Sequence, residues 1–221
     1  MKEEKNFLSE NEIKARRNVK DTIFLNLFSI PKYRLQLFQT LHPESKDVNE
    51  DDIKILTLNP VILNLAYNDL GILVKDKLLI LIEAQSTWTI NILIRVLMYL
   101  ASTYKEYIDN EKLNVYSSKK IKIPEPEFYV IYTGNKKFER DFISLKEDFF
   151  NNSNANVDLT VKIIHAENKR DIIGQYIIFC HVLDKQVKIH GRNKAAVEKA
   201  IKICQNDNIL RACLVSSEKV I

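Results

Sequence analysis

The stretch from residue 68 to residue 87 constrains the fold of this chain more than any other. Two apolar runs, residues 70–74 and 78–82, flank the polar sequence Lys-Asp-Lys at positions 75–77. Short apolar runs that are rich in isoleucine and valine, with turn residues between them, predict a pair of antiparallel strands. The rest of the chain is therefore expected to be organised around a β-hairpin.

Each predicted strand has a carboxylate at its outer end, Asp69 before the first and Glu83 after the second. If Val74 and Leu78 close a three-residue turn, counting outward places Asp69 opposite Glu83, with Cβ atoms about 4.5–5.5 Å apart. The two-residue period of a strand puts Gln85 on the same face. Carboxylates at that separation repel each other unless a cation lies between them, so this register predicts a divalent-metal site.

The spacing leaves two alternatives open. A two-residue turn would shift the pairing by one position and put the two acids on opposite faces of the sheet. Otherwise, Asp69 and Glu83 could be ordinary strand-end acids that face water and bind no metal.

The composition narrows the class of protein. A chain of 221 residues with 46% hydrophobic and 28% charged residues is typical of a soluble globular domain. The net charge of +4 permits nucleic-acid binding without requiring it. The three cysteines match no metal-ligand or redox spacing, which favours reduced thiols. The chain has neither a signal-peptide core nor an apolar run of about 20 residues, so we expect a cytoplasmic protein without a membrane span.

Apolar periodicity predicts the remaining elements. Helices are expected over residues 13–28, 31–41, 92–110, 138–150 and 171–187 and from about residue 193, and further strands over residues 53–58, 128–132 and 159–164. This order predicts a mixed α/β arrangement in three parts: a polar segment 1–17, a domain 18–190 and a C-terminal helical segment 191–221. Apolar residues continue to Leu210, Leu214 and Val215, so we expect a contact surface there and a homodimer.

Several polar side chains are candidates for contact with DNA. Arg95 and Tyr99 share a face of the predicted long helix, and the guanidinium fork of Arg95 could hold a phosphate or a carboxylate. The alternative is a salt bridge on an exposed helix face. Two basic clusters could follow a DNA backbone, although such clusters are more often solvated surface: Lys14, Arg16, Arg17 and Lys20, and Lys185, Lys188, Arg192 and Lys194.

The polar residues around and after the hairpin also form a motif. It consists of Asn68-Asp69-Leu70, Glu83-x-Gln85-Ser86-Thr87, and then Asn91, Arg95 and Tyr99. This motif resembles the recombination-promoting nuclease / transposase family of the PD-(D/E)xK nuclease superfamily. Supporting matches lie in residues 20–24, 130–134 and 200–210.

The resemblance implies a restriction-endonuclease-like α/β fold, in which helices flank a central mixed sheet. It also implies a metal-dependent DNA endonuclease associated with recombination or mobile elements. Asp69 and Glu83 would be catalytic and would bind Mg²⁺ with the backbone carbonyl of Ala84, and Mn²⁺ is expected to substitute. Gln85 stands where the superfamily usually has lysine and would be the third catalytic residue, and Asp21 matches an acid that the first helix often contributes. The alternative is a nuclease-fold protein without activity, acting as a DNA-binding or regulatory partner.

Overall fold

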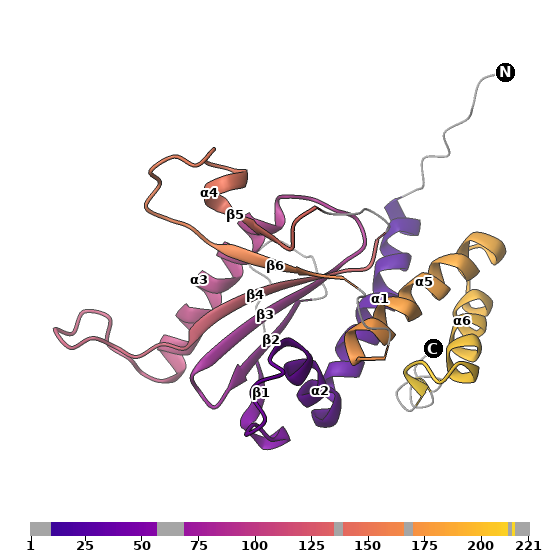
Figure 1. The fold of residues 1–221 in the computed structure, drawn as a ribbon, viewed down its shortest axis with the longest axis horizontal. Helices are drawn as coiled ribbons and strands as arrows, with labels where there is room; N and C mark the ends of the chain where they lie inside the picture. Colours follow the sequence, from indigo (N-terminus) through magenta and orange to yellow (C-terminus); the bar gives the residue numbers. More distant parts are fainter. Residues whose placement is uncertain (1–9, 57–68, 135–138, 166–169, 212–213, 215–221) are drawn as a thin grey trace.

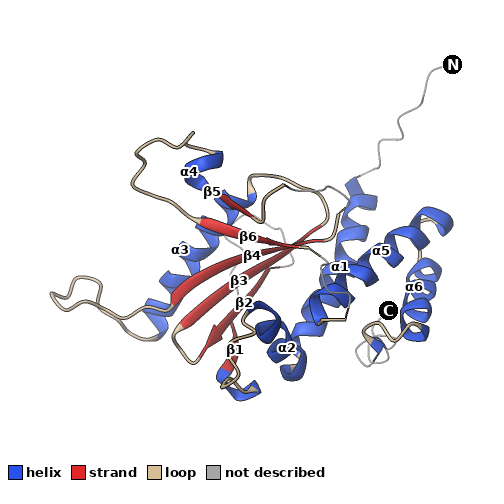
Figure 2. Cartoon of the chain, viewed as in Figure 1, coloured by secondary structure: helices blue, strands red, loops and turns tan. Residues whose placement is uncertain are grey.

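The computed structural model describes residues 10–56, 69–134, 139–165, 170–211 and 214, with the backbone alone for residues 10–18, 69 and 79. Figure 1 shows the course of the chain, and Figure 2 separates its helices from its strands. The helices are α1 (Glu10–Ser29), α2 (Pro31–Leu41), η1 (Glu50–Asp52), α3 (Ile92–Asn110), α4 (Leu145–Asp148), α5 (Ile172–His190) and α6 (Lys194–Asn206). The strands are β1 (Ile53–Leu56), β2 (Asp69–Val74), β3 (Leu78–Gln85), β4 (Glu125–Tyr132), β5 (Phe142–Ser144) and β6 (Thr160–Ile164).

The strands form a six-stranded mixed sheet in the order β1-β2-β3-β4-β6-β5. Strands β1, β2 and β3 make an antiparallel meander, and β4 and β6 continue the sheet parallel to β3. Strand β5 closes the far edge antiparallel to β6. The predicted mixed α/β class, with a central mixed sheet flanked by helices, is therefore confirmed.

The sheet buries a hydrophobic core on each face. On one face, alternate residues such as Ile72, Ile80 and Ile82 pack with side chains from α1, α2, α5 and α6. On the other face, Leu81, Val130 and Val161 belong to a second core, to which α3 contributes its apolar side. The alternation follows from the strand period of two, because neighbouring residues point to opposite faces.

The hairpin has the predicted register. Val74 pairs with Leu78 across the turn, and Asp69 pairs with Glu83 at the outer end. Lys75 and Asp76 adopt left-handed backbone conformations, with φ of 50° and 53°, and these conformations reverse the chain within three residues. The alternative register, with a two-residue turn, is therefore wrong.

Most of the predicted helices and strands are present, but the helix expected over residues 138–150 is wrong. Strand β5 occupies part of that range and pairs with β6. Ile143, Ser144 and Leu145 are all buried, while Phe142 and Phe150 are exposed. Ser144 accepts a hydrogen bond from the backbone N–H of Glu147 and so begins the single-turn helix α4.

The ends of the chain also differ from expectation. Helix α1 begins at Glu10, within the polar segment 1–17 and three residues before the start expected at residue 13. Leu210 and Leu214 are buried in the same core as α1 and α5, so they do not form the exposed contact surface that was expected. Val215 lies outside the described residues. The homodimer remains a prediction, but the burial of Leu210 and Leu214 removes the contact surface on which it was based.

Within the described ranges, no helix has the length and apolar character needed to cross a membrane.

Candidate functional site

The candidate site lies at the carboxyl end of β3, on the sheet face that α3 covers. Glu83 and Gln85 pair with Val130 and Tyr132 of β4, which belong to the core beneath α3. Asp69 shares this face through its register with Glu83, while its side chain lies outside the described residues. The hairpin thus brings the two predicted acids to adjacent positions of two paired strands.

Arg95, in the first turn of α3, binds the carboxylate of Glu83. Its Nη2 donates to Glu83 Oε1 at 2.6 Å and lies 3.5 Å from Gln85 Oε1. The Glu83 side chain is 8% exposed and that of Arg95 is 21% exposed. This is therefore a largely buried ion pair rather than a salt bridge on an exposed helix face. Tyr99, one turn further along α3, is buried in the second core.

The strand ends around Gln85 are held by a chain of hydrogen bonds. The Gln85 side-chain amide donates to the carbonyl of Thr87, and the Gln85 backbone carbonyl accepts from the Thr133 N–H at 2.9 Å. The Thr133 carbonyl in turn accepts from His181 Nε2 of α5 at 3.1 Å. Because the ends of β3 and β4 are fixed to each other and to α5, Gln85 and its neighbours have a defined position.

Thr133 and His181 were not among the predicted site residues. Thr133 belongs to the segment 130–134 that supports the family resemblance, but nothing in the spacing of the sequence connects position 181 with the end of β4. The connection arises only from the packing of α5 against the sheet.

Asp21 lies on α1, half-buried, and its charge acts on groups of α5. Together with Asp184 it adds to the effect of burial, which raises the pKa of Cys180 to about 12. Burial likewise raises the pKa of Tyr176 well above its usual value. The apolar residues of α1 pack on the sheet face opposite Glu83. The role of Asp21 as a first-helix acid stays a prediction.

The predicted basic residues fall into different environments. Lys20 is buried and forms an ion pair with Asp184 at 2.8 Å, so it is not available to a DNA backbone. The side chains of Lys14, Arg16 and Arg17 lie outside the described part of the structure. Lys185, Lys188 and Lys194 are exposed, and Arg192 is half-buried, where α5 meets α6.

Lys185 and Lys188 follow His181 at helical spacing of four and seven residues, so the three share one face of α5. His181 contacts the end of β4 beside Gln85. The basic face of α5 therefore begins at the end of β4, while α5 itself packs on the sheet face opposite Glu83.

The metal ligands predicted at this site are oxygen donors: the carboxylates of Asp69 and Glu83 and the backbone carbonyl of Ala84. Mg²⁺ takes oxygen ligands of this kind while keeping several waters. Among the side chains that the structure describes, which exclude Asp69, no three or more His, Cys, Asp or Glu residues are grouped to hold a metal. The donor set fits Mg²⁺ in chemical type.

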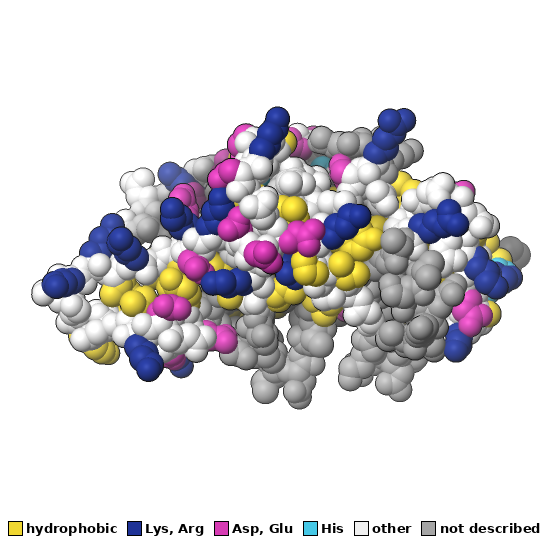
Figure 3. All heavy atoms as spheres, turned by 90° about the horizontal axis from the view of Figure 1, so that it is seen from below, with side chains coloured by type: hydrophobic (Ala, Val, Ile, Leu, Met, Phe, Trp, Pro, Cys, Tyr) yellow, Lys and Arg dark blue, Asp and Glu magenta, His cyan; other side chains and the backbone are white. Residues whose placement is uncertain are grey.

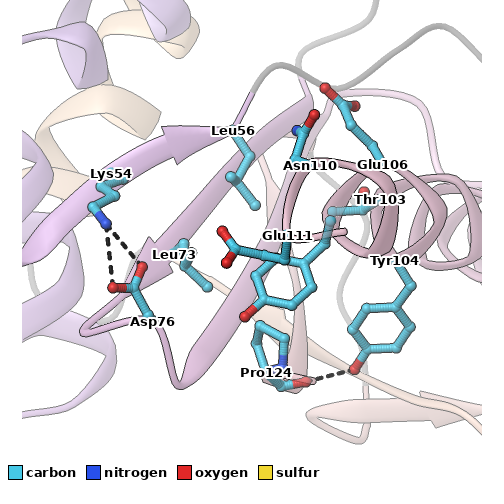
Figure 4. Close-up of a pocket in the computed structure, with 11 residues that line it drawn as sticks. Lys54, Leu56, Leu73, Asp76, Thr103, Tyr104, Glu106, Asn110, Glu111 and Pro124 are labelled. Atoms are coloured by element: carbon cyan, nitrogen blue, oxygen red, sulfur yellow. Dashed lines mark hydrogen bonds and ion pairs between the residues drawn. The ribbon is translucent and has the colours of Figure 1, made fainter. Parts of the chain in front are cut away.

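A groove of about 190 Å³ lies at the other end of the sheet, between the hairpin and the C-terminal half of α3. Figure 4 shows its apolar floor, with Leu56 and Leu73, and its polar rim. Lys54 is ion-paired with Asp76 at 2.9 Å there, and this bond, with the charge of Glu111, raises the Lys54 pKa. The groove contains none of the predicted site residues.

Comparisons with models of known protein families, with curated proteins and with solved structures found no match to this chain.

Proposed function

We propose that this chain is a metal-dependent DNA endonuclease with a PD-(D/E)xK-type fold, associated with recombination or mobile elements. The observation that carries the proposal is the pairing of Asp69 with Glu83 on one face at adjacent strand ends. The neighbouring parallel strand β4 and the helices on both faces support it, because the resembling superfamily builds its site on a hairpin of a mixed sheet flanked by helices.

Asp69, Glu83 and the Ala84 carbonyl would hold Mg²⁺, and Mn²⁺ is expected to substitute. The bound cation would lower the pKa of a coordinated water and neutralise charge on the phosphate. Gln85 would hydrogen-bond a water or a phosphate oxygen, which an uncharged amide can do without carrying a proton. The basic face of α5, with Lys185 and Lys188, would bind the DNA backbone beside the site.

Arg95 provides a positive charge next to the position where the superfamily usually has lysine. Its guanidinium lies between Glu83 and Gln85, at 2.6 Å from the first and 3.5 Å from the second. We infer that Arg95 holds Glu83 in place and supplies the charge that Gln85 lacks. Arginine suits this role because its charge persists even when it is largely buried.

The same ion pair favours a second candidate function. A buried Glu83 that is already neutralised by Arg95, beside an uncharged Gln85, is also what a non-catalytic descendant of a nuclease would contain. Such a protein would bind DNA or regulate a partner without cleaving DNA.

Cleavage of supercoiled plasmid in Mg²⁺ or Mn²⁺ separates the two functions. We expect nicking by the wild type and loss of nicking in Asp69→Ala and Glu83→Ala. Glu198→Ala is the matched control, since it removes an exposed carboxylate on α6. Activity that survives both site substitutions would refute the proposed site, and DNA binding without any metal-dependent nicking would favour the non-catalytic function.

A further inference from the structure

The connection between α3 and β4 projects from the molecule as a finger, residues 111–124 (Figure 1). From residue 112 to residue 124 it contains four lysines, at positions 112, 119, 120 and 122, and no Asp or Glu. These lysines are all exposed. In Figure 3 the corresponding end of the molecule carries several Lys and Arg side chains.

The finger also presents apolar and aromatic surface to solvent. Tyr116 is 95% exposed and Val115 is 54% exposed. Asn114, Ser117 and Ser118 flank them with groups that donate and accept hydrogen bonds. An exposed tyrosine among lysines is typical of nucleic-acid binding, because the ring can stack on a base while the lysine ammonium groups bind phosphates.

The finger has a defined conformation. Asn114 Oδ1 accepts from the Tyr116 N–H at 2.9 Å, and Ser117 Oγ accepts from the Lys119 N–H at 3.1 Å. At the base, Tyr104 of α3 donates to the Pro124 carbonyl at 2.7 Å. Because the turns are fixed before any partner binds, less conformational entropy is lost on binding.

We propose that residues 112–122 of the finger form a second DNA contact, with the lysines on phosphates and Tyr116 against a base or sugar. The inference rests on the proposed function in taking DNA as the polyanion. The groove at the base of the finger has Glu106 and Glu111 on its rim, and their negative charges repel phosphate and confine the contact to the outer part of the finger.

The sheet register places this contact at a distance from the candidate site. The finger enters β4 at Glu125, which pairs with Leu78, five residues before Glu83. At about 3.3 Å per residue the separation along the strand is about 17 Å. Along a duplex that follows the strand, the base of the finger is therefore about five base pairs from Glu83, at roughly 3.4 Å per base pair, and the outer part of the finger lies farther away.

The test is binding of a fluorescent 30-base-pair duplex to the full chain in EDTA, titrated over a range of KCl concentrations. In Lys119→Gln/Lys120→Gln/Lys122→Gln we expect weaker binding and a salt slope reduced by about 2.7, at about 0.9 per phosphate contact. Tyr116→Ala should keep the salt slope of duplex binding. In a parallel titration with single-stranded DNA, it should bind roughly 5- to 150-fold more weakly than the wild type. The charge-matched control is Lys32→Gln/Lys46→Gln/Lys146→Gln, which changes three other exposed lysines and should keep the slope.

The proposal would be overturned if the wild type did not bind the duplex, or if the finger and control variants changed the salt slope equally. It would also be overturned if the triple lysine variant of the finger lost binding to phosphatidylserine vesicles but bound DNA as the wild type does. The last result would assign the finger to a membrane surface. Finger-dependent binding without plasmid cleavage would refute the endonuclease and leave the finger contact standing. Plasmid cleavage together with DNA binding that does not depend on the finger would support the endonuclease and refute the finger contact.

Discussion

Glu83 and Arg95 are a buried acid and its cation, and their pairing accounts for how a carboxylate can lie beneath α3. A carboxylate with 8% of its side chain exposed loses most of its hydration, and the charge-assisted bond of 2.6 Å compensates for that loss. Removing one partner of such a pair leaves the other charge buried and unpaired, which is far more costly than losing a surface pair.

We therefore predict that Arg95→Ala lowers the free energy of unfolding by about 3–5 kcal/mol, measured by urea denaturation. Arg95→Lys keeps the charge but loses the fork, and it should recover part of the loss. The control is Arg140→Ala, which breaks a more exposed pair with Glu147 and Asp148 and should cost about 1 kcal/mol or less. Equal losses in Arg95→Ala and Arg140→Ala would contradict a buried pair.

Two buried cysteines make the free energy of unfolding depend on pH in the alkaline range. Burial raises the pKa of Cys180 to about 12 and that of Cys204 to about 11, from an ordinary value of 9.0. Above pH 9 the unfolded chain releases these protons while the folded chain keeps them, so folding is favoured less as pH rises. Below pH 9 both states are protonated, and this contribution is fully present.

The free energy of unfolding should thus fall between pH 9 and pH 11 by about 1.4 kcal/mol per pH unit for each of these thiols. Urea unfolding at pH 9, 10 and 11 measures this slope. In Cys180→Ala the fall should be less steep by the contribution of one thiol and by part of the contribution of Tyr176, whose pKa Cys180 also raises. An unchanged slope in Cys180→Ala would show that this thiol ionises alike in both states.

At the scale of elements, the ends of β3 and β4 approach each other so closely that residue 134 must be glycine. A Cβ atom on Gly134 would collide with the hydroxyl of Tyr132 and the carbonyl of Ser86. Ser86 follows Gln85 directly, and Thr133 bonds to the Gln85 carbonyl. The absence of a side chain at residue 134 thus maintains the spacing at the candidate site.

We predict that Gly134→Ala destabilises the fold by about 1–3 kcal/mol and also impairs plasmid nicking, because Ser86 or Tyr132 must move. Gly191→Ala is the control. Gly191 follows α5 with φ of 75°, so this change strains the backbone away from Gln85 and should lower stability without affecting nicking. If the two variants nick plasmid equally well, the close approach at Gly134 does not position the site.

The hairpin and its register were predictable from the sequence because the turn and both strands are local. Three polar residues between two apolar runs determine which residues pair, and the two-residue period of the strands then determines the sheet face of each side chain. Helix α5 begins at the expected place because Asp171 caps it, accepting from the Gly174 N–H at 2.6 Å. The helix expected over residues 138–150 was wrong because strand β5 is stabilised by pairing with β6, which is a distant partner.

On the scale of the whole molecule, the sequence could not show which apolar surfaces meet. Leu210 and Leu214 suggested a contact with another chain, yet they pack into the core that α1 and α5 share. Asp69 and Glu83 could be paired from spacing alone, whereas His181 reaches the site only through packing. The candidate site thus combines a local hairpin with contacts that depend on the complete fold.

Basic residues lie at both ends of the molecule (Figure 3), in the finger and where α5 meets α6. The candidate site lies between them along the sheet, at the carboxyl end of β3. Under the proposed function, these two groups of basic residues would contact the DNA backbone on either side of the site.

The central claim is that Asp69 and Glu83 together bind a divalent cation, and Mn²⁺ binding followed by electron paramagnetic resonance tests it without requiring a DNA substrate. We expect saturable Mn²⁺ binding by the wild-type chain, competition by excess Mg²⁺, and loss of binding in Asp69→Asn and Glu83→Gln. Glu198→Gln, on the exposed side of α6, should bind as the wild type does. Absence of binding in the wild type, or equal binding in all four chains, would contradict the account.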